Sequence, residues 1–554
     1  MQQYPSRTGW TVRDALFSLL LFGLALPVLL VHGGDQSLMG TDEGYYAQMA
    51  REMLAGRGWF DQTFLGRPWF EKPPLNQWLI AASFALLGVN ETSARLPGAL
   101  SAALSVVLTY ALGCAAFSWR RALIGALVLP GTYLWMFYGR QALQDQVLTA
   151  IELSGLLFLV AAAGAKRPSP WALGWGVCLG LGLLTKSTMI LLSVAATLPW
   201  LVAHNRYHRL LANRWLYLGV ALGLALFGGW FWGASAVWGQ GVAIQLFGKV
   251  LNLGQQPFHN VGPLFYLWNL PANTFPWTFF ALGGAWVCWR ENRRSYFLPL
   301  SYCLVFVALL QLFATKEPYY MVQVCPFVAL LAGAAIESLW PLPGRRPSSA
   351  LIWTTLLVGG LGALLVVAAT VLAFMPTLGV GAYLPLAVIL GLAWMACFAA
   401  LRLRGRLRPW REVWTGCLVG GPWVTLVLAG LLTDIGDYSP TFKAFGRQRL
   451  PALVDSAPVT IVYELNGERV SEFIEQAFYT PNPTGYLTAQ ELMEAAPTRF
   501  FWLAPESRAI LDRARFPYRP LADPVLGWTI AASVEPNQAQ AHTLAQTRRS
   551  SAHD

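Results

Sequence analysis

Long apolar runs separated by short polar breaks dominate the chain. Runs close to the ~20 residues that cross a hydrocarbon layer predict transmembrane helices. We predict about thirteen spans, at residues 15–32, 97–117, 122–138, 147–164, 171–185, 187–203, 215–237, 263–288, 296–313, 319–338, 350–374, 380–400 and 413–433. The pattern therefore predicts a mainly α, polytopic membrane protein.

The polar breaks fix a predicted orientation. Residues 78–89 are apolar but short, and we place them along the outer interface rather than across the membrane. With that choice the arginine-rich breaks fall on the cytoplasmic side, as the positive-inside rule requires. The first helix is then an uncleaved span with a cytoplasmic N-terminus, and the region after Thr433 lies outside.

The pattern changes after Asp434. Short strand-like segments at 459–463, 500–503 and 527–534 alternate with helix-like segments at 470–478, 489–495 and 506–516. We predict a membrane domain over 1–433, with a first outer loop at 33–96 that carries interfacial helices. A small outer α/β domain over 434–535 and a disordered tail over 536–554 follow.

Composition narrows the class of protein. The 554 residues are 55% hydrophobic and 12% charged, which excludes a soluble enzyme. The formal charge of +11 comes from basic residues in the breaks between spans, without the aromatic-interleaved basic stripe of a nucleic-acid binder. All seven cysteines lie in apolar stretches, so they predict packing rather than a disulfide or zinc framework.

Two outer segments carry candidate carboxylates. Asp42 and Glu43 open an amphipathic stretch at 41–54 that also holds Tyr45 and Tyr46. Asp42 either caps this helix or does chemistry. Asp145 directly precedes the fourth span, where a charge so near hydrocarbon is costly. Its alternative interpretation is a structural pair with Arg140.

Isolated cations lie at the same predicted face. Lys72 follows Glu71 and precedes two prolines, which hold the pair at the membrane surface. Lys186 and Lys316 lie at outer helix ends, and together these cations indicate a negatively charged ligand. The alternative for Lys72 is a snorkelling interfacial lysine. His259, in the outer loop 239–262, is either a minor site residue or a solvated histidine.

The ordered set of these motifs resembles a known family. Asp42-Glu43, then Glu71-Lys72-Pro73-Pro74-Leu75, then 140–145 and 182–186 resemble the bacterial aminoarabinose-transferase and protein O-mannosyltransferase superfamily, the GT-C fold glycosyltransferases. The match runs from Asp42 to Pro326. Segment 316–326 is similar to the part of these proteins that helps line the donor site, which implies a lining role for Tyr319 and Tyr320.

The resemblance implies transfer of a sugar from a polyprenyl-phosphate donor to an acceptor at the outer face of the bacterial inner membrane, with inversion at the anomeric carbon. Asp42, beside Glu43, would act as general base and Asp145 would position the acceptor. The departing phosphate would be stabilised by cations. These are Lys72, Arg140, Lys186 and Lys316.

The acceptor and any metal stay open at this point. Lipid A, another envelope glycan and a protein hydroxyl are equal options. This chain also has Tyr45 where the family often has Arg, and Asn76-Gln77 where it often has aromatic pairs. A divalent ion with oxygen ligands is a further option. Its candidate ligands are Asp42, Glu43, Glu71, Asp145 and His259.

Two other classes of protein compete with this interpretation. A transporter or flippase of lipid-linked saccharides also needs many spans, but transporters bury charge near the midplane, whereas these ionisable residues lie at outer ends. A membrane-anchored assembly factor would use the outer domain for binding. It leaves Asp42, Lys72 and Asp145 without a role.

Overall fold

The chain folds into two compact units. The computed structural model describes residues 11–56, 59–165, 167–255, 262–291, 296–341, 345–432, 437–465, 468–494 and 499–534. The helical unit comprises 1–35, 59–61 and 70–435, and the outer unit comprises 36–58, 62–69 and 436–554. Residues 36–58 and 62–69 of the first predicted outer loop therefore fold with the C-terminal region, whereas the rest of that loop belongs to the helical unit.

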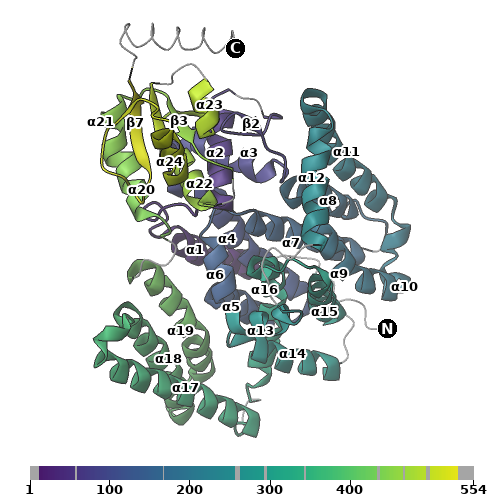
Figure 1. Cartoon of the computed structure of the whole chain (residues 1–554). Helices are drawn as coiled ribbons and strands as arrows, with labels where there is room; N and C mark the ends of the chain where they lie inside the picture. The colour runs from purple at the N-terminus through teal and green to yellow at the C-terminus, as the bar shows by residue number, and fades with distance from the viewer. Residues whose placement is uncertain are drawn as a thin grey trace, which may run out of the picture. The chain divides into compact units, whose positions relative to one another are not determined.

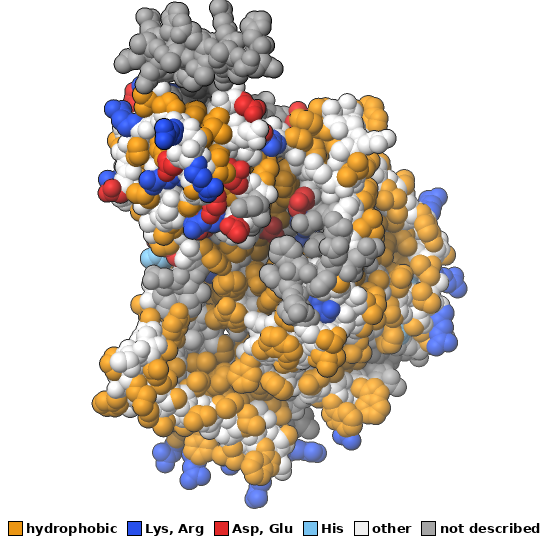
Figure 2. Space-filling model, in the orientation of Figure 1, with side chains coloured by type: hydrophobic (Ala, Val, Ile, Leu, Met, Phe, Trp, Pro, Cys, Tyr) orange, Lys and Arg blue, Asp and Glu red, His pale blue; other side chains and the backbone are white. Residues whose placement is uncertain are grey.

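The helical unit is built from α-helices, most of which are apolar (Figure 1). They are α1 (Val12–Leu30), α3 (Leu75–Leu87), α4 (Glu91–Ala116), α5 (Trp119–Val128), α6 (Tyr133–Gly139), α7 (Gln144–Ala163), α8 (Trp171–Lys186), α9 (Ile190–Ala203), α10 (Asn205–His208), α11 (Arg214–Trp238), α12 (Gly241–Gln255), α13 (Phe265–Asn273), α14 (Trp277–Glu291), α15 (Phe297–Leu312), α16 (Cys325–Ser338), α17 (Ser349–Ala373), α18 (Leu384–Arg402) and α19 (Trp410–Leu432). Figure 2 shows apolar side chains over the visible surface of α17, α18 and α19.

The helices confirm a polytopic membrane protein. Within the described residues nine helical stretches are long and apolar enough to cross a membrane, or ten if the pair 119–131 and 133–139, bent by 63°, is one span. The count of about thirteen stays a prediction, because α15 is shorter than these stretches and α8 and α9 form one of them. The apolar segment that we placed at the interface forms the 13-residue helix α3, and its interfacial position stays a prediction.

Several predicted spans are not single α-helices. Residues 263–288 form α13 and α14, which are separated by the segment 274–276. Pro276 explains the break, because the residue before a proline is disfavoured in the α conformation and proline donates no backbone hydrogen bond. The segment 319–338 likewise begins as a 3₁₀ helix, η5 (Pro318–Val324), before α16.

Small residues bring α8 and α11 into close contact. Both helices carry a Gly-x-x-x-Gly pattern, Gly176 with Gly180 and Gly219 with Gly223. A Cβ on Gly180 would lie 2.2 Å from the Gly223 carbonyl oxygen, and one on Gly223 would lie 2.2 Å from the Gly176 carbonyl oxygen. Only hydrogen fits there, so the two backbones pack directly, as is common between membrane helices.

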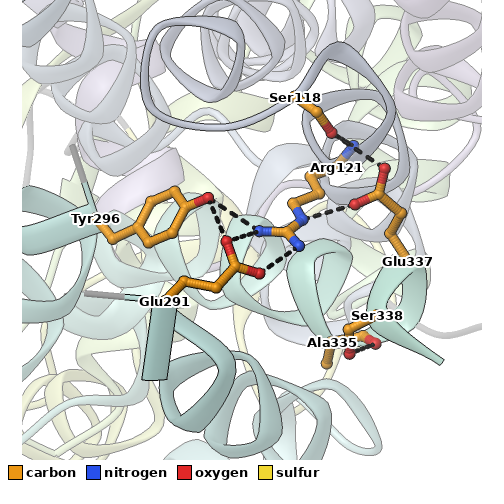
Figure 3. A network of polar contacts seen from close by, with 7 residues as sticks. All are labelled: Ser118, Arg121, Glu291, Tyr296, Ala335, Glu337 and Ser338. Atoms are coloured by element: carbon orange, nitrogen blue, oxygen red, sulfur yellow. Dashed lines mark hydrogen bonds and ion pairs between the residues drawn. The ribbon is translucent and has the colours of Figure 1, made fainter. Parts of the chain in front are cut away.

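An arginine joins three further helices (Figure 3). The Arg121 guanidinium on α5 donates to Glu291 at 2.8 Å and to Glu337 at 2.6 Å, which lie on α14 and α16. Tyr296 accepts a further bond from the same guanidinium at 3.0 Å. Because both carboxylates share one planar fork of donors, this network fixes the three helix ends relative to one another.

The outer unit contains a five-stranded mixed sheet in the order β4-β3-β5-β7-β6. β3 is parallel to β4 and β5, whereas β7 is antiparallel to β5 and β6. The strands are β3 (Val459–Val462), β4 (Pro483–Leu487), β5 (Phe500–Leu503), β6 (Tyr518–Pro520) and β7 (Thr529–Ser533). The helices are α20 (Pro440–Ala444), α21 (Leu450–Val454), α22 (Val470–Tyr479), α23 (Ala489–Glu494) and α24 (Pro505–Arg513), with a π-helical segment η8 (Phe445–Arg449).

The first outer loop completes this unit. It supplies α2 (Asp42–Leu54) and the short hairpin β1 (Thr63–Phe64) and β2 (Arg67–Pro68). Arg51 donates to the backbone carbonyls of Phe478 and Thr480, at 3.1 and 2.8 Å. The backbone N–H of Ser37 donates to Asp437 at 2.8 Å. Loop and sheet domain are thus one folded body, although Trp69 and Gly436 lie 367 positions apart in the sequence.

Candidate active site

A buried ion pair is the centre of the site in the helical unit. The Lys186 Nζ lies 2.7 Å from the Asp145 Oδ1, and both side chains are almost fully buried. Asp145 belongs to the first turn of α7, and Lys186 is the last residue of α8. These positions suit their charges, because a helix favours an anion at its N-terminus and a cation at its C-terminus.

Two tyrosines flank the ammonium group. The Lys186 Nζ lies 4.6 Å from the ring centre of Tyr319 and 5.1 Å from that of Tyr320. Both rings belong to η5, where Pro318 at the first position starts the 3₁₀ helix. The two faces add cation–π stabilisation to the ion pair. The structure therefore brings together four of the predicted residues: Asp145, Lys186, Tyr319 and Tyr320.

Further buried polar groups surround the first turns of α7. Gln144 and Gln146 are buried beside Asp145, and Gln146 donates to the Trp135 carbonyl at 3.0 Å. Glu152 lies two turns further along α7, is 4% exposed, and is within electrostatic reach of Asp145 and Lys186. Glu152 was not among the predicted site residues. Its signal was a carboxylate inside an apolar run, on the helix face of Asp145.

Arg140 and Lys316 have backbone partners. The Arg140 guanidinium donates to the carbonyls of Val28 and Val31 at 3.0 and 2.5 Å. Arg95 donates to the Gly33 carbonyl at 2.7 Å, so two cations meet the C-terminal end of α1. Burial lowers the pKa of Arg140, and the Arg95 charge acts in the same direction. The ion-pair partner of Asp145 in the structure is Lys186, whereas the Arg140 guanidinium donates to backbone carbonyls.

Lys316 is buried, and its Nζ donates to the Phe313 carbonyl at 2.6 Å. Glu71 and Lys72 are half-buried in the turn before α3, and Pro73 and Pro74 behind them are buried. The neighbouring Phe70 N–H donates to the Gln245 side chain of α12 at 2.7 Å. These contacts hold the predicted turn against the helical unit.

Asp42 and Glu43 belong to the outer unit, as the first two residues of α2. Glu43 is fully buried and accepts a hydrogen bond from the Met39 N–H at 2.9 Å. Asp42 is half-buried, and the N-cap position before it is Thr41. Two carboxylates at the positive end of α2 are favourable in charge.

Glu52 has a structural role in the same unit. Its carboxylate accepts hydrogen bonds from Thr63, the Leu65 N–H and Gln48, at 2.7, 2.7 and 2.9 Å. These bonds fasten the β1–β2 hairpin to α2. Tyr46 is buried in the core, whereas Tyr45 is half-buried and stacks on Trp69, with ring centres 5.5 Å apart.

The metal prediction is not resolved by these contacts. Within the described ranges no three or more His, Cys, Asp or Glu side chains gather closely enough to hold an ion. His259 lies outside the described residues, as does most of the turn around it. A divalent ion on Asp42, Glu43, Glu71, Asp145 and His259 stays a prediction.

Comparison with known proteins points to one class. Residues 71–232 match the family model described as dolichyl-phosphate-mannose-protein mannosyltransferase. An undecaprenyl phosphate-α-4-amino-4-deoxy-L-arabinose arabinosyl transferase from Pectobacterium carotovorum subsp. carotovorum (strain PC1) is 29% identical over 79% of each chain. One from Pseudomonas fluorescens (strain Pf0-1) is 29% identical over 60% of this chain and 59% of its own.

The fold agrees with these sequence matches. ArnT from Cupriavidus metallidurans in the apo state has a TM-score of 0.75 at 19% identity, and covers 94% of this chain and 98% of its own. The same protein bound to undecaprenyl phosphate has a TM-score of 0.73, also at 19% identity, with 96% and 99% covered. The chain is therefore a multi-pass membrane glycosyltransferase with the GT-C fold. Within that class it is similar to the aminoarabinose transferases.

Proposed function

We propose that the chain moves a sugar from a polyprenyl-phosphate donor to an acceptor at the outer face of the bacterial inner membrane. The observation that carries the proposal is the buried Asp145–Lys186 pair with its two tyrosines. A solved structure that shares the fold binds undecaprenyl phosphate, which supports a lipid phosphate as the ligand.

The ion pair suits an anionic leaving group. An ammonium has three N–H donors, and Asp145 takes one of those of Lys186. Its remaining donors are available to phosphate oxygens in a site where burial strengthens electrostatic attraction. Lys72 adds a second cation to the phosphate site, whereas the backbone contacts of Arg140 and Lys316 favour structural roles.

The chemistry follows from these assignments. The acceptor oxygen attacks the anomeric carbon, and the bond between that carbon and the phosphate oxygen breaks. Asp42 takes the acceptor proton as general base, and the electron pair of the broken bond leaves on the polyprenyl phosphate. The phosphate is a competent leaving anion, so no acid catalyst is needed. A single displacement inverts the anomeric carbon.

Lipid mass spectrometry tests this proposal in cells. A strain that lacks the gene is complemented with the wild-type chain, Asp42→Asn or Lys186→Met. We expect both variants to accumulate a polyprenyl-phosphate sugar and one envelope acceptor to lose a sugar-sized mass. That acceptor, whether lipid A, another glycan or a protein, is identified by the same spectra. Wild-type lipid profiles in both variants contradict the proposal.

The transporter alternative rests on one observation, the buried Glu152 within α7. A flippase would move the lipid-linked sugar without breaking its phosphate bond. Free polyprenyl phosphate must therefore appear in reactions of a transferase, and it does not appear in those of a flippase.

A further inference from the structure

A hollow in the outer unit is not used by the ion-pair site. Its volume is about 260 Å³. That lies just below the ~300 to 1,000 Å³ typical of drug-sized ligands, so it suits one small ring. All the residues that line it belong to the outer unit.

Two aromatic walls form this hollow. The loop supplies Tyr45 and Trp69, whose rings stack at 25°. The sheet domain supplies Tyr463, Phe473 and Tyr486, and the first two rings are 4.6 Å apart and nearly parallel. A hollow lined by large rings leaves apolar surface wet, which is unfavourable unless a ligand covers it.

A polar edge accompanies the rings. The Arg67 guanidinium lies 3.9 Å from the ring centre of Tyr486 and donates to the Tyr486 carbonyl at 3.2 Å. It is 3.8 Å from the Glu491 carboxylate, and its side chain is 44% exposed. Arg67 lines the hollow, so its guanidinium adds hydrogen-bond donors to the aromatic lining.

This combination matches a sugar ring. The C–H bonds on one face of a pyranose carry partial positive charge, and aromatic faces are negative. The hydroxyl groups around the edge of the sugar accept hydrogen bonds, which the guanidinium of Arg67 can donate. A purely apolar guest would leave this polar edge unused.

The position of the hollow connects it to the proposed chemistry. Tyr45 follows Asp42 by three residues on α2, so the two side chains share one helix face with Cβ atoms ~5 to 6 Å apart. Both residues belong to the outer unit, so this placement is internal to one folded body. We propose that the hollow is a saccharide subsite that holds a sugar ring of the acceptor, an assignment that rests on the proposed transfer.

Direct binding to the purified full chain tests the subsite without transfer. The probes are the methyl glycosides of glucose, mannose and N-acetylglucosamine, observed by saturation-transfer difference NMR. We expect one probe to receive saturation at its ring C–H groups. Tyr486→Ala weakens this binding about tenfold, as the loss of one ring contact predicts. The absence of a signal from all three overturns the subsite.

The sheet offers a matched control. Tyr486 lies on the edge strand β4, and Tyr518 lies on the opposite edge strand β6. Tyr518→Ala should leave binding unchanged. Val470→Trp fills the hollow from its exposed rim without removing a packed side chain. Equal binding by wild type, Tyr486→Ala and Val470→Trp places the probe elsewhere and overturns the subsite.

Kinetics separate this inference from the proposed function. Tyr486→Ala should raise the KM for the acceptor identified above and leave the KM for the donor unchanged. A raised donor KM alone contradicts the acceptor assignment. If the glycosides bind but no transfer occurs with the wild type, the proposed function fails while the saccharide subsite stands.

Discussion

Lys186 and Asp145 are buried residues of opposite charge, and either charge alone would be unfavourable at this position. Removing one partner of a buried pair leaves the other uncompensated and costs about 3–5 kcal/mol, whereas replacing both by uncharged groups costs much less. This difference separates the contribution of the pair to protein stability from its contribution to function. The pair can be dispensable for folding and still be required to bind the donor phosphate.

A double-mutant cycle measures that difference. We expect Asp145→Asn and Lys186→Met each to lower the free energy of unfolding by about 3–5 kcal/mol. The double variant should recover most of this loss, because no unpaired charge remains. Transfer should be absent in all three. Thermal unfolding in detergent and an assay of transfer give the two readouts, and additive stability losses contradict a coupled pair.

Glu475 gives the outer unit a pH dependence. Its side chain is buried, at 7% exposure, and this burial raises the pKa of Glu475 from 4.5 to about 7. The negative charge of Glu472 acts in the same direction, whereas hydrogen bonds with Ser439 and Gly40 lower the pKa. The folded state then holds a proton that the unfolded state releases. Stability is therefore fully present below pH 4.5 and is lost as the pH rises through about 7.

The free energy of unfolding of the outer unit should fall by up to about 3 kcal/mol between pH 4.5 and neutral pH. Hydrogen exchange of β3 and β5 peptides in the full chain, corrected for intrinsic exchange rates, measures this decrease. Glu475→Gln should flatten the profile, since glutamine does not titrate. An unchanged slope in that variant assigns the pH dependence to another group.

At the scale of elements, the contact of α8 with α11 positions Lys186. The two Gly-x-x-x-Gly patterns allow no Cβ between the helices, and Lys186 follows Gly180 by less than two turns. Any separation of these helices moves the C-terminal end of α8. The ion pair therefore depends on residues that contact no charged group.

Gly223→Leu tests this dependence. It should cost about 1–3 kcal/mol through overpacking and weaken transfer, because the end of α8 shifts. Gly228→Leu is the matched control on the same helix, where a Cβ meets no atom within 4 Å. Unfolding in detergent and transfer are measured for both. If the two variants change stability and transfer equally, the close contact of α8 with α11 at Gly223 does not position Lys186.

At the scale of the whole molecule, the outer unit joins segments from both ends of the chain. Arg51 donates to two carbonyls at the end of α22, and Leu38 N–H donates to the Tyr479 hydroxyl at 2.8 Å. The helix that carries Asp42 is therefore supported by the C-terminal domain. Removal of the C-terminal domain should therefore abolish sugar transfer altogether, rather than change only which acceptor is selected.

Truncation after Thr433 tests this connection. We expect the truncated chain to lose transfer and hydrogen-exchange protection over α2. Binding of undecaprenyl phosphate, followed by native mass spectrometry, should persist because Asp145 and Lys186 lie in the other unit. Removal of residues 536–554 alone is the control and should retain transfer. Transfer by the chain truncated after Thr433 contradicts the assigned support.

Sequence periodicity predicted most of the helices and the inner strands, but it assigned residues 239–262 to a loop, where the structure has α12. β3, β5 and β7 lie within the predicted strand segments, because buried strands consist of apolar runs. The edge strands β4 and β6 were missed, since β4 contains Pro483 and Gly485, which normally indicate a turn. The break between α13 and α14 was missed although Pro276 was visible.

The site was predicted in part for a different reason. Residue type and position within a span identified Asp145 and Lys186 separately, since charges near hydrocarbon need partners. Their pairing required the contact of α7 with α8, which no local pattern encodes. The aromatic hollow was missed because Tyr45 and Tyr486 lie 441 positions apart in the sequence and meet only through the fold.

The most direct test of the central claim is release of free polyprenyl phosphate by the purified chain. The chain is reconstituted in liposomes with extracted polyprenyl-phosphate sugars and an envelope extract, and the lipid products are counted by mass spectrometry. We expect the wild type to release free polyprenyl phosphate and to add one sugar mass to an acceptor, and Asp42→Asn to do neither. Lipid-linked sugar that crosses the bilayer intact, with no phosphate released, would contradict a transferase.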